Sequence, residues 1–295
     1  MKILIIGKNG QLGKSINKAA SNTDKSFQFD FIGRQELDLS NIGDIDSFFN
    51  HNIYDVVINC AAYTNVDMAE KDYDLSNAIN NLAVKKIARI AKIQSFKFIH
   101  ISTDYVFSGH KDKPYTEEDI TGPINAYGRS KLEAESAIMT TLENNAIIIR
   151  TSGLYSEFGN NFVNTMLTLV KQKKEISVVS DQIFCPTSAS DLAEAILTII
   201  NTEKFKSKTK KTEIYQYCSN NACSWFDFAN EIFRLSNNSI KVNPIKLHNY
   251  PALANKPQYS VLNTSKIEKE FGLTVLDWKE ALGRLFVLKH ISNQL

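Results

Sequence analysis

The stretch KILIIGKNGQLG, from Lys2 to Gly13, decides the fold. It opens with a short, continuous apolar run that ends in glycine, a pattern typical of a strand buried on both faces of a parallel sheet. Gly7, Gly10 and Gly13 follow at the spacing GxxGxxG, just before a helical pattern. Small residues there let the backbone turn tightly and approach a pyrophosphate, and a helix N-terminus offers unpaired N–H groups. The alternative is three turn glycines without a ligand.

Strand and helix patterns alternate through the rest of the first half. Further strands are expected at 27–33, 54–62, 95–107 and 145–155, with helices at 11–20, 44–49, 77–92 and 126–142. Such alternation is typical of βαβ units wound into one parallel sheet with helices on both faces. Beyond about residue 152 the pattern loosens, and helices are expected at 162–172, 190–201 and 224–236.

These patterns predict an α/β protein with a Rossmann-type doubly wound parallel sheet and a smaller α+β substrate-binding lobe. We assign residues 1–152 to a dinucleotide-binding domain. Residues 153–295 are assigned mainly to the lobe, with some segments expected to return to the sheet.

Composition narrows the class of protein. The 295 residues are 43% apolar and carry a net charge of +2, so neither disorder nor a nucleic-acid partner is expected. The basic run at 206–211 is short and is interpreted as a solvated loop. Four scattered cysteines without a CxxC pair favour free thiols in a reducing compartment. No segment has the roughly 18–20 apolar residues of a membrane span, so we expect a soluble, cytoplasmic protein.

Tyr127 and Lys131 lie one helical turn apart in NAYGRSKLEAE, so they share a helix face. With a nicotinamide cofactor nearby, this pair has a chemical meaning. A ketone that accepts hydride also needs a proton, and an ammonium beside a phenol is expected to lower the phenol pKa towards working pH. Ser102 and Thr103 end a predicted strand, where a doubly wound sheet binds ligands, so one of these hydroxyls is the candidate to polarise the carbonyl.

Cofactor preference is predicted from the end of the second strand. NAD-preferring enzymes often place an acidic residue there, whereas this chain has Arg34, which could pair with a 2′-phosphate. We therefore expect NADPH, with NADH possible. A surface arginine in a turn is nearly as good an interpretation. Asp38 and Leu39 follow and are predicted to flank the adenine.

Together these motifs identify a resemblance. The sequence resembles the extended short-chain dehydrogenases/reductases, in which GxxGxxG replaces the GxGxxG fingerprint. More narrowly, it is similar to the dTDP-4-dehydrorhamnose reductase family. The shared stretches, which extend to about residue 263, are GKNGQLG, ELDLSN, INCAAYTNVDMAE, STDYVFSG, INAYGRSKLEAE, IIRTSGLY, NNFVNTM, VVSDQIFCPTSASDLA and KPQYSVLN.

The resemblance implies reduction of the 4-keto group of a dTDP-6-deoxy-L-hexulose with NADPH or NADH, the last step of dTDP-L-rhamnose synthesis. It makes Tyr127 the proton donor, Lys131 its partner, and Thr103 a hydrogen-bonding group near C4. The remaining positions that it implies are Asp104 and Tyr105 beside the sugar, Gly10, Gln11 and Leu12 on the pyrophosphate, and Ala61, Ala62 and Tyr63 along the cofactor groove.

Asn161 belongs to a stretch that matches a family segment near the substrate. An N-cap of the helix that follows is an equally good interpretation of this asparagine.

The chain departs from the family pattern at several positions. Some members dimerise around a magnesium ion held by glutamates, but Ser15 and Ser190 stand at those positions, so we predict no metal. A homodimer remains possible, but one bridged by metal is in doubt. Gly153 replaces a sugar-contacting tryptophan and is expected to open the pocket. Lys256 replaces an arginine and loses bidentate geometry towards phosphate.

Three alternatives stay open. The protein could reduce another nucleotide 6-deoxysugar, because Gly153 and Lys256 alter the sugar side. It could be a non-catalytic binding or regulatory subunit, although such proteins commonly lose the tyrosine or lysine. An epimerase or dehydratase would need further acid/base residues, and dehydratases tend to carry Asp-Glu where this chain has Asp104 and Tyr105.

Overall fold

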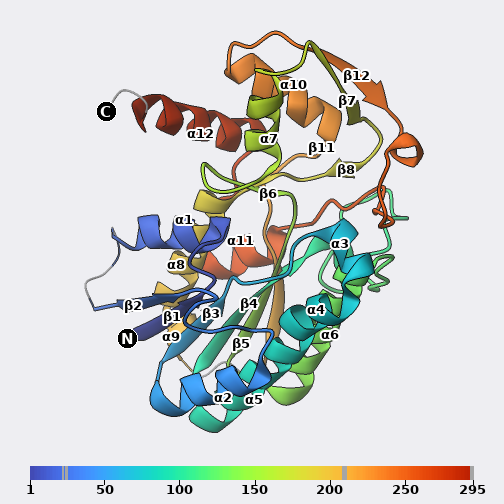
Figure 1. Ribbon diagram of the computed structural model, residues 1–295. Coiled ribbons are helices and arrows are strands. Elements are labelled where there is room, and N and C mark those ends of the chain that lie inside the picture. The colour runs from blue at the N-terminus through green and yellow to red at the C-terminus, as the bar shows by residue number, and fades with distance from the viewer. Residues whose placement is uncertain (22, 24–25, 208–210, 293–295) are drawn as a thin grey trace.

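The computed structural model describes residues 1–21, 23, 26–207 and 211–292. At its centre is a six-stranded parallel sheet with the order β10-β5-β4-β3-β1-β2 (Figure 1). The order reverses direction between β1 and β3, which is where doubly wound sheets bind ligands. The predicted α/β fold is confirmed. The strands are β1 (Lys2–Ile6), β2 (Gln28–Ile32), β3 (Val56–Asn59), β4 (Lys97–Thr103), β5 (Ala146–Thr151) and β10 (Glu213–Gln216).

Helices cover both faces of the sheet (Figure 1). Alternate residues of a strand point to opposite faces, so Ile3 and Ile5 enter one core and Leu4 and Ile6 the other. The first core packs on α1 (Gln11–Ala20), α8 (Ala189–Asn201) and α11 (Ser265–Phe271), and the second on α2 (Ile42–His51), α5 (Ala83–Gln94) and α6 (Ala126–Thr141). The strand β10 and the helices α8 and α11 come from the second half of the chain.

Two predicted strands are shorter in the structure because side chains and glycine redirect the backbone. β4 stops at Thr103, whose hydroxyl accepts the Tyr105 N–H and starts the 3-10 turn η2 (Asp104–Val106). β5 stops at Thr151, because Gly153 turns the chain with φ +51°. The next residues form β6 (Leu154–Tyr155), which pairs with β9 (Thr187–Ser188).

The helix expected at 77–92 consists of a π-helical turn followed directly by an α-helix. α3 (Val66–Lys71) and α4 (Tyr73–Asn77) lead into a π-helical turn, η1 (Ala78–Leu82), and α5 follows without a break. A π turn inserts an extra residue, which rotates the side chains that follow it. This turn directs Asn80 into the protein, where its side chain is buried.

A smaller lobe lies above the sheet (Figure 1). Trp225 and Trp278 contact Phe228 in its core. The lobe is α+β, as predicted. Its elements are α7 (Phe162–Leu169), α10 (Trp225–Leu235), α12 (Trp278–Ser292), β7 (Glu175–Val179) paired with β12 (Lys241–Ile245), and β8 (Ile183–Phe184) paired with β11 (Cys223–Ser224).

Two short helices complete the fold, α9 (Glu203–Lys206) and η3 (Leu247–Asn249). The basic run at 206–211 lies partly outside the described residues. Cys60, Cys185, Cys218 and Cys223 are all free thiols. Over the described ranges, none of the helices has the length and apolar character to cross a lipid bilayer.

Candidate active site

The glycine loop after β1 is shaped for close backbone approach. Gly7 has φ +101°, and a Cβ there would lie 2.8 Å from the Ala61 nitrogen. A Cβ at Gly13 would lie 2.2 Å from the Gly7 oxygen, so α1 packs directly on the loop. Gly10 is the N-cap of α1, and no side chain caps the first turn. The turn therefore presents backbone N–H groups of the kind that bind phosphate.

Gln11 and Leu12 can contribute only backbone to such a site. Leu12 is buried in the core beneath the sheet. The Gln11 amide donates to the Leu154 oxygen at 3.3 Å and accepts from Ser156 and Asn161 at 3.0 and 2.9 Å. These bonds tie the glycine loop to the start of the upper lobe.

Just past the carboxyl ends of β1 and β2 lie two cations, Lys8 and Arg34, and each is paired with a carboxylate. Arg34 donates to Asp38 at 3.0 Å while its side chain stays 74% exposed. Lys8 lies 2.5 Å from Glu36, which also accepts the Gly33 N–H at 2.8 Å. The sequence prediction missed Lys8 and Glu36. Because β1 and β2 are parallel neighbours, residues just past both strands meet at one edge, and that rule could have found Lys8.

The carboxylates of this edge are held in their charged form. The Ser40 hydroxyl, then its N–H, and then Arg34 lower the pKa of Asp38. The Lys8 ammonium is the main cause of the lowered pKa of Glu36. Leu39, predicted to flank the adenine, buries its side chain in the core with Leu37.

The loop Ala61-Ala62-Tyr63 is half-buried and is held from behind by Asn80. The Asn80 oxygen accepts the Tyr63 N–H at 2.8 Å, and its NH₂ group donates to the Tyr63 oxygen and to Ser130 on α6, both at 3.1 Å. Asn80 was also missed, because a π turn has no sequence pattern that distinguishes it from an α-helix.

At the end of β4, a buried carboxylate organises the Thr103 hydroxyl. Thr103 donates to Asp104 at 3.0 Å, and Ser152 donates to the other carboxylate oxygen at 2.8 Å. Burial raises the pKa of Asp104 to about 6, although hydrogen bonds from Ser260, Ser152 and Thr103 oppose the rise. Ser102 is also buried, and its hydroxyl has no hydrogen-bond partner among the described residues, so Thr103 is the better-placed hydroxyl.

Tyr127 and Lys131 lie on the inward face of α6, which Asn125 caps by accepting the Gly128 N–H at 2.7 Å. Tyr127 is half-buried and forms an edge-to-face contact with Tyr105, with ring centroids 6.1 Å apart. Lys131 is 1% exposed, and burial lowers its pKa to about 8, although Glu135 and Cys60 act in the opposite direction.

One prediction about this pair is wrong. The sequence led us to expect that Lys131 lowers the pKa of Tyr127, but burial raises it to about 12, with only a hydrogen bond from Thr103 acting to lower it. The reason is the direction of the ammonium. Lys131 Nζ donates to the Ile101 oxygen at 2.6 Å and lies 3.0 Å from His100 Nε2.

Lys256, one of the predicted sugar-side residues, lies near the N-terminus of α6. Asn125 donates to the Asn255 oxygen at 2.9 Å, which places Lys256 beside the helix start. Lys256 lies 3.8 Å from Asp67 and 4.8 Å from the ring centre of Tyr250. Gln182 donates to the Tyr105 hydroxyl at 3.4 Å and to the Pro257 oxygen at 3.1 Å.

Asn161 has no free polar atom for a ligand. Its oxygen accepts the Asn164 N–H at 3.1 Å as the N-cap of α7. Its NH₂ group donates to Gln11, Ser156 and Phe158 at 2.9, 2.9 and 3.1 Å. The helix-cap interpretation accounts for all of these contacts.

Comparisons with known proteins identify the family of the whole chain. Residues 1–290 match the family model for the RmlD substrate binding domain. The dTDP-4-dehydrorhamnose reductase of Sinorhizobium fredii is 38% identical over 289 residues, 97% of this chain and 96% of that protein. The chain belongs to the dTDP-4-dehydrorhamnose reductase family.

Solved structures of this family have the same fold. The dTDP-4-dehydrorhamnose reductase of Clostridium acetobutylicum is 40% identical with a TM-score of 0.90, covering 98% of this chain and 100% of that one. The enzyme of Bacillus anthracis, crystallised in complex with NADP, is 35% identical with a TM-score of 0.89, covering 97% and 99%.

Gly153, where we predicted an opened pocket, lies directly against an aromatic side chain. A Cβ at this position would lie 2.4 Å from a carbon of the Phe184 ring, and Phe184 stacks on Trp225 with centroids 3.9 Å apart. The Phe184 ring occupies the space towards which a side chain at 153 would point. The enlarged sugar site stays a prediction.

Ser15 and Ser190, which we predicted to stand in place of metal-binding glutamates, lie on neighbouring helices. Ser15 is buried on α1 and donates to the Gln11 oxygen at 3.0 Å, while Ser190 is on α8, which packs against α1. In the part of the chain that the structure describes, no three His, Cys, Asp or Glu side chains are grouped to hold a metal. The absence of a metal in the working protein stays a prediction.

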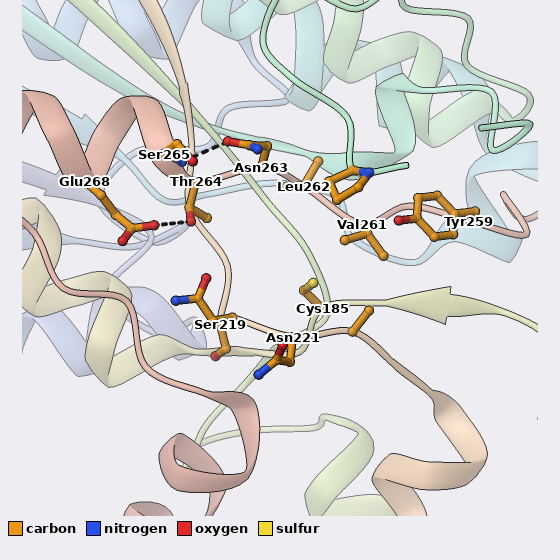
Figure 2. A pocket seen from close by; sticks show the side chains of 13 residues that line it. Cys185, Ser219, Asn221, Tyr259, Val261, Leu262, Asn263, Thr264, Ser265 and Glu268 are labelled. Atoms are coloured by element: carbon orange, nitrogen blue, oxygen red, sulfur yellow. Dashed lines mark hydrogen bonds between the residues drawn. The ribbon is translucent and has the colours of Figure 1, made fainter. Parts of the chain in front are cut away.

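A separate cavity of about 320 Å³ lies between the chain segments around Ser219 and Thr264 (Figure 2). Its described lining contains none of the predicted site residues, and its one charged side chain, Glu268, accepts a hydrogen bond from Thr264. Figure 2 also shows Cys185 on its wall. We assign no ligand to this cavity, because its described lining offers no further unpaired polar group.

Proposed function

We propose that the protein reduces the 4-keto group of dTDP-4-dehydro-L-rhamnose, a dTDP-4-dehydro-6-deoxy-L-hexose, with hydride from NADPH. This is the last step of dTDP-L-rhamnose synthesis. Relatives that match nearly the whole chain carry the name of that activity. The observation that carries the proposal is the convergence of Thr103, Tyr127 and Lys131 at the carboxyl edge of the sheet.

The glycine loop fits a dinucleotide. Gly7 and Gly13 leave no room for side chains, and the uncapped first turn of α1 supplies N–H donors for a pyrophosphate. Lys8 and Arg34 offer positive charge for a 2′-phosphate, which favours NADPH over NADH. Ala61, Ala62 and Tyr63 would line the groove beside the adenosine and nicotinamide ribose. When bound, the nicotinamide supplies the hydride.

Tyr127 supplies the proton. Its raised pKa keeps the phenol protonated at neutral pH, so a proton is available for the carbonyl oxygen. Thr103 is held by Asp104 and orients the phenol and the sugar carbonyl. Lys131, one helical turn further along α6, would help to restore the proton of Tyr127. Tyr105, Gly153 and Lys256 would surround the sugar nucleotide, and Asn161 would act only by shaping the loop around Ser156.

We also propose roles for the two parts of the chain, a cellular compartment and a mode of association. Residues 1–152 would hold the dinucleotide and residues 153–295 mainly the sugar nucleotide. Four free cysteines favour a reducing compartment, which is consistent with the cytoplasm. If the protein dimerises, Ser15 and Ser190 predict an interface without bridging metal.

The test follows nicotinamide absorbance with purified protein, NADPH and dTDP-4-dehydro-L-rhamnose made in situ. Wild-type protein should oxidise NADPH, with NADH slower. Tyr127→Phe should lower kcat by about a hundredfold or more, the scale of losing an acid catalyst. Tyr54→Phe is the matched control, because Tyr54 precedes β3 at the opposite edge of the sheet and should leave kcat unchanged.

Each outcome separates the alternatives. Equal rates for wild type and Tyr127→Phe would reject the proposed proton donor. NADPH binding without turnover would reject this sugar. Turnover with another dTDP-4-keto-6-deoxysugar would then identify a related reductase, whereas no turnover with any of them would indicate a binding subunit.

A further inference from the structure

Behind the catalytic helix, Lys131 ends in a buried network that runs away from Tyr127 into the sheet. Lys131 Nζ lies 3.0 Å from His100 Nε2, and His100 Nδ1 lies 3.3 Å from the Asn59 side-chain nitrogen. His100 and Asn59 are paired in register on β4 and β3, and both are 0% exposed. Neither residue was singled out by the sequence analysis, and the reaction as described does not use them.

The orientation of the Asn59 amide is fixed. Its oxygen accepts the Ala61 N–H at 3.0 Å, so its NH₂ group must face His100. That contact is a hydrogen bond only if His100 Nδ1 is unprotonated and accepts. A neutral imidazole carries one proton, which must then be on Nε2. The fixed amide therefore determines the tautomer of the buried histidine.

This tautomer conflicts with a charged Lys131. A proton on His100 Nε2 points at Lys131 Nζ, and the contact is satisfied only if Nζ has a lone pair, as a neutral amine has. If Lys131 is an ammonium, Nε2 must accept, the imidazole proton moves to Nδ1, and two donors face each other at Asn59. Buried groups without a partner are costly, so the network favours loss of a proton from Lys131.

The other charged groups around Lys131 do not remove this conflict. Glu135, one turn further along α6, raises the pKa of Lys131, but its carboxylate is engaged by Arg150 from β5 at 2.6 Å. Cys60, just past β3, is a neutral thiol because burial raises its pKa to about 12. Burial and then Lys131 keep the pKa of His100 well below its usual value, so an imidazolium is excluded as a way out.

We propose that Asn59 and His100 are positioning residues that weaken the hold of Lys131 on its proton, so that Lys131 exchanges a proton with Tyr127 during turnover instead of remaining a permanent cation. The catalytic part of this statement rests on the proposed function. The equilibrium part concerns the free protein alone. When Lys131 loses its charge, one proton leaves the pair for water, and the single imidazole proton changes from Nδ1 to Nε2.

The first test observes that change without sugar or cofactor. Full-length protein labelled with ¹⁵N-histidine is followed by long-range ¹H–¹⁵N correlation NMR through the neutral and alkaline range, and His100→Gln assigns the signal. His100 should stay neutral throughout and change from the Nδ1–H to the Nε2–H tautomer, with a midpoint near the Lys131 pKa of about 8. A single tautomer at every pH, or an imidazolium, would overturn the proposal.

A second variant, Asn59→Asp, should favour the Nδ1–H tautomer of His100, which is compatible with a charged Lys131. Asn59→Asp keeps the acceptor for Ala61 and replaces the donor that faces His100 with an acceptor. The tautomer midpoint should rise by about one pH unit or more, a tenfold change in proton affinity. Asn41→Asp adds the same charge at the cap of α2 and is the matched control. An unchanged or lowered midpoint in Asn59→Asp contradicts the assignment.

The catalytic part is tested by the pH profile of sugar reduction. The limb that depends on Lys131 should move in parallel with the tautomer midpoint in Asn59→Asp, which a merely structural role would not produce. A normal tautomer change in a protein that reduces no sugar would reject the proposed function and leave the network assignment standing. Sugar turnover in a protein whose His100 tautomer stays the same at every pH would reject the network assignment and leave the proposed function standing.

Discussion

The buried face of α6 and the exposed edge beyond β2 both hold charged side chains, but by different means. On α6, Lys131 and Glu135 are almost fully buried. At the edge, Arg34 is 74% exposed, and its partner Asp38 is also close to solvent. Buried charges depend strongly on their partners, whereas exposed pairs contribute little and are weakened by salt. The same residue types should therefore give large effects in one region and small ones in the other.

The largest effect is expected at the buried ion pair. Arg150 donates three hydrogen bonds to Glu135 at 3.0, 3.2 and 2.6 Å, and both side chains are 3% exposed. Arg150→Met leaves a buried carboxylate without its partner and should cost about 3–5 kcal/mol of unfolding free energy. Urea unfolding monitored by circular dichroism measures the change.

Arg234→Met is the control for that experiment. Arg234 also makes two hydrogen bonds to a glutamate, Glu231 on α10, but the Arg234 side chain is 68% exposed. Arg234→Met should show no comparable loss of unfolding free energy. The double variant Arg150→Met/Glu135→Leu should recover much of the stability, because no charge is left buried. Equal losses for the two arginine variants would mean that burial does not distinguish them.

The next prediction concerns the pH dependence of stability, which should have opposite signs for the two aspartates Asp104 and Asp38. Burial raises the pKa of Asp104 to about 6, so its ionised form costs stability as pH rises from about 4 to about 6. Removing this carboxylate with Asp104→Asn should therefore become more favourable at neutral pH than at pH 4, by up to about 3 kcal/mol.

Asp38 should behave in the opposite way. Its pKa is lowered by Ser40 and Arg34, so it adds stability above its unfolded pKa and loses it as pH falls through the folded value. Asp38→Asn should thus be relatively worse at neutral pH than in acid. Unfolding free energies of both variants at pH 4 and pH 7.5 test the pair. Parallel pH dependences would remove the distinction between the two regions.

How much the sequence predicts also differs between the regions. The glycine spacing, the strand ends and the YxxxK pair are local patterns, so the sheet and the positions of Thr103, Tyr127 and Lys131 could be predicted. Five of the six sheet strands were expected from apolar runs. The sixth, β10, was not, because its four residues EIYQ form no distinctive pattern.

What escaped prediction depends on residues far apart in sequence. Asn80 acts through a π turn, and His100 and Asn59 meet only because β3 and β4 are paired in register. Phe184 fills the space beside Gly153 from the strand β8, about thirty residues later in the chain. The raised pKa of Tyr127 is also a property of packing, because the YxxxK pattern gives the spacing of the pair but not the direction of the ammonium.

The smallest effect is expected at the exposed edge, in cofactor choice. Arg34→Ala removes a cation that could meet a 2′-phosphate, so the KM for NADPH should rise about 3–10-fold at low salt, the scale of an exposed charge contact. The KM for NADH should not change. Because the contact is exposed, the effect should shrink as ionic strength increases. Lys18→Ala, on α1 and paired with Glu157, is the matched control.

Substitution of Asp38 tests the same cofactor contact with the opposite expected sign. In the structure it is the partner of Arg34, so a phosphate must compete with a carboxylate for the same guanidinium. Asp38→Asn should weaken that competition and lower the KM for NADPH, opposite in sign to Arg34→Ala. Changes of the same size for NADPH and NADH in either variant would show that this edge does not select the cofactor. The choice would then depend on Lys8, whose ammonium is held by Glu36 only two residues away from Asp38.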